Sequence, residues 1–292
     1  MLTGTYTALI TPFKKGQLDE TAFTRLVKAQ VRAGVDGVVP VGTTGESPTV
    51  TSEEHIRLIE LAVKAANGRI KVMAGTGANS TSEAIHYTKA AEKLGADASL
   101  QVSPYYNKPS QEGLFQHFKA VARATSLPIV LYSIPGRCVV PIAVDTVKRL
   151  ASSCKNIMAI KEAGGDADRV SQLREALPDS FVILSGDDAL TLPFMSVGAS
   201  GVVSVASNIL PRQISKMVRA FAQGDTRAAL KLHETYYPLF KALFIETNPV
   251  PIKTAMAMLG QVDEEFRLPL VKLNKSSRAS LSQALKAAKV LK

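Results

Sequence analysis

Short apolar runs with the composition of β-strands alternate with stretches of helical periodicity along most of this chain. The runs recur between residues 5 and 223, and they are Tyr6–Ile10, Gly37–Val41, Ile70–Ala74, Ala98–Val102, Ile129–Tyr132, Ile157–Ile160, Val182–Leu184 and Val202–Val205. Strands separated by helices pair in parallel, so the pattern predicts an α/β protein. The sheet could be open and doubly wound or closed, and about eight evenly spaced units without a weak edge strand favour a (β/α)8 TIM barrel.

The ends of the helical stretches carry their own signals. Thr51 and Thr81 precede early acidic residues, as N-terminal caps do, and Gly34 and Gly95 stand where C-terminal caps belong. After residue 224 the strand-like runs stop and the rest is helical. Prolines punctuate this part at Pro238, Pro249, Pro251 and Pro269. We therefore expect a catalytic barrel over residues 1–224 and a C-terminal helical domain over residues 225–292.

The composition argues against several classes of protein. The two cysteines, Cys138 and Cys154, are too few for a disulfide framework and suit a reducing cytoplasm. The four histidines show no metal-binding spacing, and we expect neither a metal nor a nucleotide. The net charge of +10 comes from scattered basic residues, so no nucleic-acid partner is expected. No apolar stretch approaches the ~18 residues of a membrane span and the N-terminus does not read as a signal peptide, so we expect no membrane association.

Chemically unusual residues gather directly after the predicted strands. They are Gly42–Glu46, Gly75–Asn79, Pro104–Asn107, Tyr132 with Arg137, Lys161 with Glu162, and Ser185–Asp188. The C-terminal ends of all strands share one rim of a barrel, and barrel enzymes build their active sites there. The sequence therefore predicts an enzyme with a single pocket at this rim.

Lys161 is the most informative single residue. Strand alternation would place Ile157, Ala159 and Lys161 on one face. If that face is the barrel interior, the poorly hydrated surroundings disfavour the charged form of the amine. A neutral amine can attack a ketone and form a Schiff base. The structural alternative is a lysine at a strand end that reaches solvent, and only the neighbouring residues favour the reactive interpretation.

Those neighbours complete a possible site. The phenol of Tyr132 could exchange protons with the help of a hydroxyl such as that of Thr43. The Gly42–Glu46 loop offers successive N–H groups and two hydroxyls to a small carboxylate, and the fork of Arg137 suits a second one. Each feature also has an ordinary structural explanation. Tyr132 could be a core tyrosine, the loop a plain turn, and Arg137 part of a surface salt bridge. Tyr105 and Tyr106 point opposite ways in an extended segment, so one could reach a partner.

These residues together resemble the pyruvate-dependent class I aldolase and lyase family, which includes N-acetylneuraminate lyase. The resemblance extends over the whole chain, and Arg137 marks the synthase branch of the family. The segments that carry it are Gly42–Ser47, Ala74–Asn79, Pro104–Pro109, Gln111–Leu114, Leu131–Tyr132, Pro135–Arg137, Ile160–Ala163 and Leu184–Asp188.

The resemblance implies a role for each reactive residue. Lys161 is expected to form a covalent Schiff base with pyruvate, with no further cofactor. Tyr132, Thr43 and Tyr106 are expected to form a proton relay, with Tyr106 supplied by a neighbouring subunit. The family is usually a homotetramer, a dimer of dimers, which suits a shared tyrosine.

The remaining residues are expected to bind substrate. Thr43 and Thr44 would hold the pyruvate carboxylate, while the Gly186 carbonyl and Val203 would line its pocket. Arg137 would bind the carboxylate of aspartate 4-semialdehyde, which the enamine of pyruvate attacks. The resemblance thus implies the first committed step towards diaminopimelate and lysine.

Feedback inhibition by lysine is also expected. Responsive family members bind lysine near residues that match Ser47, His55, Asn79, Glu83 and Tyr105. The chain departs from them at Ser52, where another histidine is frequent, and at Pro48, where alanine is common. The alternative for His55 is an exposed histidine on a helix.

Two other functions stay open. One is a sister lyase that cleaves a 2-keto-3-deoxy sugar acid or sialic acid with the same Lys161 and Tyr132. A polyhydroxylated sugar calls for hydroxyl-binding groups rather than the fork of Arg137. The other is a basic barrel without catalysis that binds an anionic ligand or nucleic acid, and the intact set of Lys161, Tyr132, Thr43 and Tyr106 argues against it.

Overall fold

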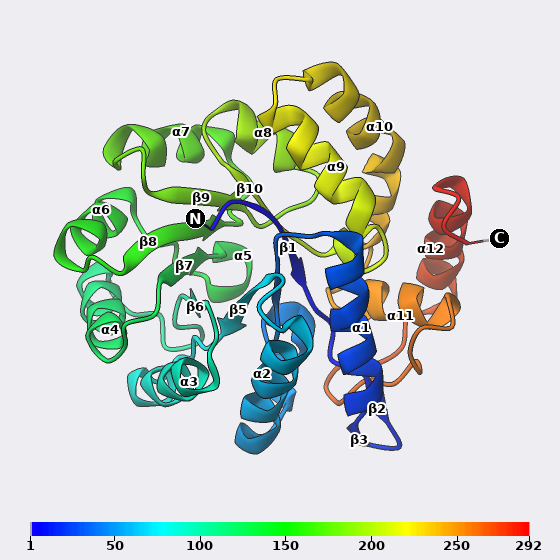
Figure 1. The fold of residues 1–292 in the computed structure, drawn as a ribbon, viewed down its shortest axis with the longest axis horizontal. Helices are drawn as coiled ribbons and strands as arrows, with labels where there is room; N and C mark the ends of the chain where they lie inside the picture. The colour runs from blue at the N-terminus through cyan, green and yellow to red at the C-terminus, as the bar shows by residue number, and fades with distance from the viewer. Residues whose placement is uncertain (1, 292) are drawn as a thin grey trace.

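Eight parallel strands close into a barrel in the computed structural model, which describes residues 2–291 (Figure 1). The barrel strands are β1 (Gly4–Ala8), β4 (Gly37–Val39), β5 (Lys71–Gly75), β6 (Ala98–Val102), β7 (Ile129–Ser133), β8 (Ile157–Glu162), β9 (Val182–Ser185) and β10 (Gly201–Ser204). They are hydrogen-bonded in the order β1-β10-β9-β8-β7-β6-β5-β4, and β4 closes on β1. The predicted TIM barrel is confirmed.

Helices surround the barrel. They are α1 (Glu20–Ala33), α2 (Ser52–Ala66), α3 (Thr81–Leu94), α4 (Gln111–Arg123), α5 (Pro135–Cys138), α6 (Val144–Ser153), α7 (Ala167–Ala176), α8 (Thr191–Ser196) and α9 (Pro211–Ala222). Thr51 forms a reciprocal capping box with Glu54, and Gly34 and Gly95 adopt the left-handed cap conformation, as predicted. The cap predicted at Thr81 is wrong by one residue, because α3 is preceded by Ser80, which makes no side-chain cap hydrogen bond.

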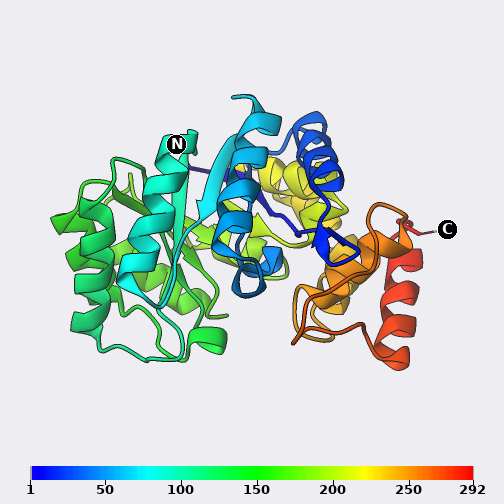
Figure 2. The same ribbon diagram turned by 90° about the horizontal axis from the view of Figure 1, so that it is seen from below.

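Three helices follow residue 224 and lie at one side of the barrel (Figures 1 and 2). They are α10 (Thr226–Ala242), α11 (Val250–Met258) and α12 (Lys275–Ala287). Pro238 was expected to separate two helices, but it lies inside α10. Leu239 and Phe240 of α10 join the same hydrophobic core as Ile214 of α9. The boundary at residue 224 stays a prediction.

One strand of the barrel departs from strict alternation. The register between β7 and β8 shifts, because Ile129 pairs with Ile157 while Val130 pairs with Ala159. Met158 is therefore an extra residue in β8, and it is exposed. Ile157 consequently packs in the outer core against the helices, and the prediction that it shares a face with Lys161 is wrong.

A short hairpin that the sequence pattern did not predict lies between β1 and α1. Its strands are β2 (Phe13–Lys14) and β3 (Gln17–Leu18). Its turn places Lys15 and Gly16 at positive φ, a conformation that glycine adopts without steric cost. Phe13 is completely buried, so the hairpin packs against the rest of the molecule through this residue.

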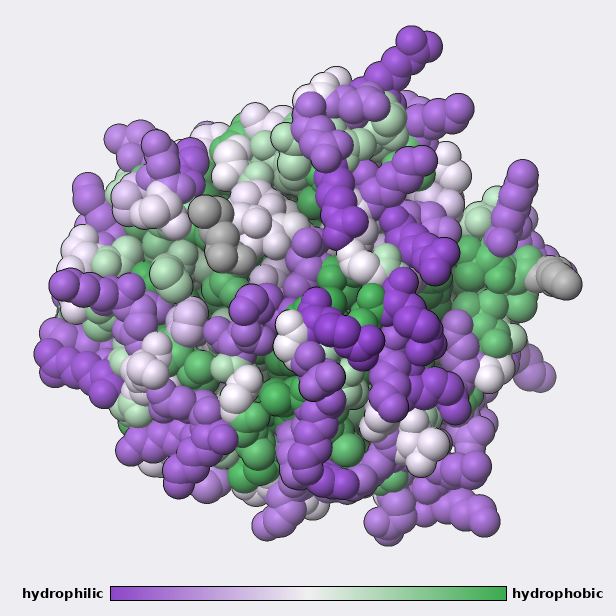
Figure 3. Space-filling view, in the orientation of Figure 1, coloured by the Kyte–Doolittle hydropathy of each residue, from purple (hydrophilic) through white to green (hydrophobic). Residues whose placement is uncertain are grey.

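The face shown in Figure 1 is covered mainly by hydrophilic side chains, with smaller hydrophobic areas between them (Figure 3). Within residues 2–291, no helix combines the length and the apolar character needed to cross a membrane.

Candidate active site

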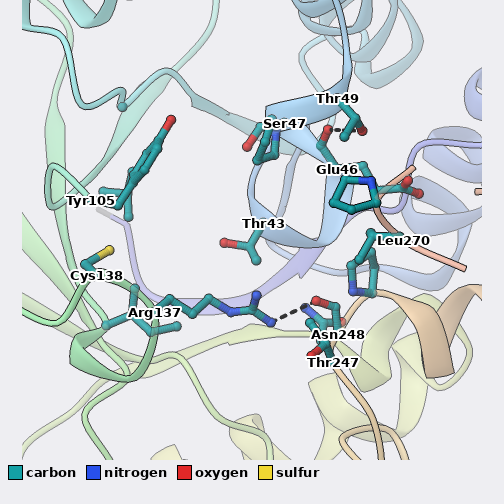
Figure 4. A pocket seen from close by; sticks show the side chains of 16 residues that line it. Thr43, Glu46, Ser47, Thr49, Tyr105, Arg137, Cys138, Thr247, Asn248 and Leu270 are labelled. Carbon is teal, nitrogen blue, oxygen red and sulfur yellow. Dashed lines mark hydrogen bonds between the residues drawn. The ribbon is translucent and has the colours of Figure 1, made fainter. Parts of the chain in front are cut away.

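A cavity of about 270 Å³ opens at the C-terminal end of the barrel (Figure 4). Four of the predicted site residues line it, namely Thr43, Ser47, Tyr105 and Arg137. The end of β6 and the residues after β4, β5 and β7 contribute to its wall, since Val102, Thr43, Gly77 and Ile134 all line it. The cavity therefore lies at the rim where the sequence predicts a pocket.

Lys161 and Tyr132 face each other inside the barrel, next to this cavity. Both side chains are buried, and the Nζ of Lys161 lies 4.0 Å from the centroid of the Tyr132 ring. The two residues are paired between β7 and β8, and Tyr132 is also paired with Val102, which lines the cavity. The register of three neighbouring strands thus places the amine and the Tyr132 ring together in the barrel interior, and Val102, the strand partner of Tyr132, lines the cavity. Neither Lys161 nor Tyr132 is itself part of the cavity wall.

The chain has a second buried lysine, Lys253 of α11, and its surroundings are different. Its Nζ lies 2.6 Å from a carboxylate oxygen of Glu46, and both side chains are fully enclosed. Burial lowers the pKa of Lys253, while the Glu46 carboxylate opposes that shift. Lys161, by contrast, has no ion-pair partner among residues 2–291. Lys161 is therefore the buried amine without a counterion.

Gly186 leaves the space that the Lys161 side chain occupies. A Cβ at position 186 would lie 3.0 Å from the Cε of Lys161 and 2.6 Å from the Cβ of Ala163. Any larger residue would push against the amine, so the absence of a side chain here has a steric reason. Val203 is buried in the barrel interior with Tyr132 and Ala159. Neither position lines the cavity, and their role around bound pyruvate stays a prediction.

The Gly42–Glu46 loop folds as a tight turn rather than an open cradle. Its N–H groups at Gly45 and Glu46 donate within the turn, to the carbonyls of Gly42 and Thr43. The N–H groups of Gly45 and Glu46 are therefore not available to a carboxylate, and the prediction that the loop offers its successive N–H groups is wrong from Gly45 onward. Thr43 lines the cavity, whereas Thr44 is buried beside it.

Glu46 ends this turn in the left-handed conformation, with φ of 55°, which is uncommon for a residue with a side chain. The ion pair with Lys253 holds its carboxylate in place. Sequence reasoning missed Lys253, although a single lysine within the apolar run Val250–Met258 is a signal for a buried cation.

Arg137 lies on α5 and reaches across the cavity mouth (Figure 4). Its Nη2 donates a 2.8 Å hydrogen bond to the backbone oxygen of Asn248. The neighbouring Cys138 also lines the cavity, and burial raises the pKa of its thiol to about 11. The thiol is therefore protonated at neutral pH, and the guanidinium is the permanent charge at this wall.

Tyr106 is not brought to the cavity of its own chain. Its side chain is 91% exposed and its φ is 73°, while the adjacent Tyr105 lines the cavity. The two tyrosines thus have opposite surroundings, as predicted, but the predicted extended segment is wrong, because the φ of Tyr106 lies in the left-handed region. The role of Tyr106 in the relay stays a prediction, since it needs a second copy of the chain.

His55 is buried rather than exposed on its helix. Its Nε2 donates to the backbone oxygen of Gly75 at 2.7 Å, and its ring stacks on Tyr87 at 4.0 Å. Burial lowers its pKa to about 4, so the imidazole is neutral at neutral pH. The hydroxyl of Tyr87, a residue that the sequence analysis did not select, donates to Glu83 at 3.4 Å.

Among the other residues expected to bind lysine, Ser47 and Tyr105 line the cavity, whereas Asn79 and Glu83 do not. Asn79 donates through its Nδ2 to the backbone oxygen of Tyr105 at 3.2 Å. Burial and then the Glu83 charge raise the pKa of Tyr105. Ser47 and Tyr105 line the cavity together. The printed contacts thus link Asn79 with Tyr105, and His55 through Tyr87 with Glu83, while the lysine site itself stays a prediction.

Asp188, in the segment after β9, is a structural residue. It is buried and accepts hydrogen bonds from the Ser204 hydroxyl and from the N–H groups of Val205 and Ala206. Burial raises its pKa to about 6. The described part of the chain holds no group of three metal-ligating side chains.

The barrel and its rim cavity define an enzyme of the TIM-barrel class. The model of the dihydrodipicolinate synthetase family matches residues 1–288. The chain therefore belongs to this family, and the resemblance drawn from the motifs is confirmed.

Its relatives extend over the same length. It is 52% identical over 286 residues to the 4-hydroxy-tetrahydrodipicolinate synthase of Aquifex aeolicus, covering 98% of this chain and 97% of the relative. A solved structure of 4-hydroxy-tetrahydrodipicolinate synthase from Methylacidiphilum fumariolicum superimposes with a TM-score of 0.98 at 61% identity, covering 99% of this chain and 96% of that one.

Two further solved structures contain small molecules. The dihydrodipicolinate synthase of Cyanidioschyzon merolae with lysine bound is 43% identical, with a TM-score of 0.96 and 99% of both chains covered. The chloride-inhibited enzyme of Acinetobacter baumannii in complex with pyruvate is also 43% identical, with a TM-score of 0.97 and both chains fully covered.

Proposed function

We propose that this chain condenses pyruvate with L-aspartate 4-semialdehyde and releases 4-hydroxy-tetrahydrodipicolinate. The observation that carries the proposal is the buried Lys161 amine, which has no counterion among residues 2–291 and lies against Tyr132. Val102, the strand partner of Tyr132, lines the cavity that Arg137 also lines. The names of relatives that are about half identical over the whole chain support the same reaction.

The reaction begins at Lys161. Its amine adds to the carbonyl carbon of pyruvate, and water leaves to give an imine. Loss of a methyl proton turns the imine into an enamine, which attacks the aldehyde carbon of the semialdehyde. The aldehyde oxygen takes up a proton as the carbon–carbon bond forms. The Tyr132 ring lies 4.0 Å from the Lys161 Nζ, and its phenol moves these protons with Thr43 and Tyr106.

Cyclisation then frees the enzyme. The amino group of the bound adduct attacks the imine carbon, and the Lys161 amine leaves as the ring closes. No cofactor is needed, because the lysine itself supplies the electron sink. We also propose a homotetramer, a dimer of dimers, whose partner subunit supplies Tyr106, because this side chain is almost fully exposed in a single chain.

Arg137 recognises the second substrate in this proposal, and its replacement gives a selective test. We expect Arg137→Ala to lower kcat/KM for the semialdehyde by roughly 10- to 150-fold, the value of a hydrogen bond to a charged group. Trapping of pyruvate by borohydride should not change, because Arg137 lies across the mouth of the cavity and not at the amine. Steady-state kinetics and mass spectrometry measure the two effects.

The same variant separates the synthase from the sister lyase. A lyase for a 2-keto-3-deoxy sugar acid or sialic acid would trap pyruvate on Lys161 but would not turn over the semialdehyde. Unchanged kinetics of Arg137→Ala with the semialdehyde would contradict the proposed role of the guanidinium.

We also propose that free lysine inhibits the enzyme by binding near Glu83 and Tyr105. The carboxylate of Glu83 is exposed and can pair with an ammonium group of lysine. We expect Glu83→Ala to raise the lysine concentration that gives half inhibition by roughly tenfold or more, with little change in uninhibited kcat. Glu175→Ala, which removes an exposed carboxylate from α7, is the matched control. Equal inhibition of the wild type and Glu83→Ala by lysine would rule out this site.

A further inference from the structure

Asn248, in the segment just before α11, contacts both groups that the proposed function assigns to substrate carboxylates. Its side-chain Nδ2 donates to the Thr44 hydroxyl oxygen at 3.1 Å. Its backbone oxygen accepts from the Arg137 Nη2 at 2.8 Å (Figure 4). Asn248 itself is buried and lines the cavity. One residue from the C-terminal region thus connects two walls of the site.

The direction of the first hydrogen bond determines what Thr44 can do. A hydroxyl has one proton to donate and two lone pairs to accept with. Because Asn248 occupies a lone pair of Thr44, the hydroxyl proton stays available for another acceptor. Thr44 is buried and makes no other side-chain hydrogen bond among residues 2–291. A substrate carboxylate is the kind of acceptor that such an oriented hydroxyl suits.

Lys253 anchors the segment that carries Asn248. It lies five residues further on, and its ion pair with Glu46 returns to the turn that contains Thr44. The ammonium also lies over the rings of Phe13, at 4.1 Å from the centroid, and Phe266, at 5.3 Å. The barrel turn and the C-terminal segment are thus joined at two points, of which only the Asn248 contact touches a proposed ligand of pyruvate.

We propose that Asn248 is a positioning residue, whose amide orients the Thr44 hydroxyl toward the pyruvate carboxylate and whose carbonyl holds Arg137 over the semialdehyde. The inference rests on the proposed function. It also assigns each of the two contacts of Asn248 to a different substrate. The amide acts on pyruvate alone, while the backbone carbonyl, which no substitution of the side chain removes, acts on the semialdehyde.

The test compares Asn248→Ala with Thr44→Val and with the double variant. We expect Asn248→Ala to raise KM for pyruvate by roughly three- to tenfold, the value of one hydrogen bond, with KM for the semialdehyde unchanged. In the Thr44→Val background the same substitution should have no further effect, because the hydroxyl that it orients is gone. Gln283→Ala, which removes an exposed amide from α12, is the matched control.

A second variant tests the anchor without leaving a buried charge unpaired. Glu46→Gln with Lys253→Met keeps both side chains uncharged, and we expect it to raise KM for both substrates, because the whole segment loses its attachment. A circular dichroism spectrum like that of the wild type confirms that the double variant is folded. Unchanged KM values in this folded double variant would overturn the anchoring role of Lys253.

The outcomes separate this inference from the proposed function. A wild type that is not trapped by pyruvate and borohydride contradicts the proposed function itself. A wild type that is trapped, with an Asn248→Ala variant of unchanged KM for pyruvate, contradicts only the role of Asn248. An equal rise of KM in the presence and absence of the Thr44 hydroxyl also overturns it, since the amide would then act by another route.

Discussion

Replacing Lys161 with alanine is expected to lower kcat by roughly 10⁴-fold or more, the scale on which loss of a covalent nucleophile acts. The amine is the group that forms the imine, and no other amine in the described chain is both buried and free of an ion pair. Removing the side chain should leave the barrel folded, since Lys161 makes no ion pair that holds two elements together.

The measurement is kcat with saturating pyruvate and semialdehyde, beside thermal unfolding of each variant. Lys155→Ala is the matched control, because Lys155 precedes the same strand but is exposed. We expect the control to keep its activity and the Lys161→Ala variant to keep its unfolding temperature while losing turnover. Activity within tenfold of the wild type in Lys161→Ala would show that the amine is not the nucleophile.

Tyr132→Phe is expected to lower kcat by roughly 10²- to 10⁴-fold, the usual contribution of a positioned proton donor and acceptor. The substitution keeps the ring that lies 4.0 Å from the Lys161 Nζ and removes only the hydroxyl. Packing in the barrel interior should therefore be preserved, because the side-chain volume hardly changes. The loss should appear in the steps that move protons.

Exchange of the pyruvate methyl protons with deuterated solvent isolates one such step, because it needs only imine and enamine formation. We expect the exchange rate of Tyr132→Phe to fall together with kcat. Tyr237→Phe is the control, since Tyr237 lies on α10 with its side chain exposed. If exchange and turnover in Tyr132→Phe match those of the wild type, another group carries the proton.

The barrel could be predicted from sequence because each strand is buried between two layers of apolar side chains. Such strands appear as short apolar runs, and all eight runs became strands of the barrel. The rim could be predicted for the same reason, since parallel strands carry the residues that follow them to one end. Lys161, Thr43 and Arg137 can therefore be predicted as site residues from the positions that they take after the strands.

The bulge in β8 could not be predicted in this way. Met158 has the same apolar character as its neighbours, and only the register against Val130 shows that it is an extra residue. The face of Ile157 was consequently assigned wrongly, while Lys161 was placed correctly because the bulge lies before it. Alternation thus held only on the C-terminal side of the bulge.

The contacts that the C-terminal region makes with the site could not be predicted from the sequence either. Lys253 meets Glu46 across 207 positions of sequence, and Asn248 meets Thr44 across 204 positions. The local sequence pattern does not indicate such a contact, because the secondary structure of each segment can be predicted without it. The sequence pattern likewise does not indicate what Tyr106 contacts, since its expected partner lies on another copy of the chain.

The central claim is that Lys161, and not Lys253, forms the covalent intermediate with pyruvate. The direct measurement is borohydride reduction of the intact protein with pyruvate, followed by peptide mass spectrometry. We predict one 1-carboxyethyl group per chain on the lysine nitrogen, carried by the peptide that contains Lys161, and none in Lys161→Ala. A modified Lys253, or a protein with no added mass, would contradict this account of the site.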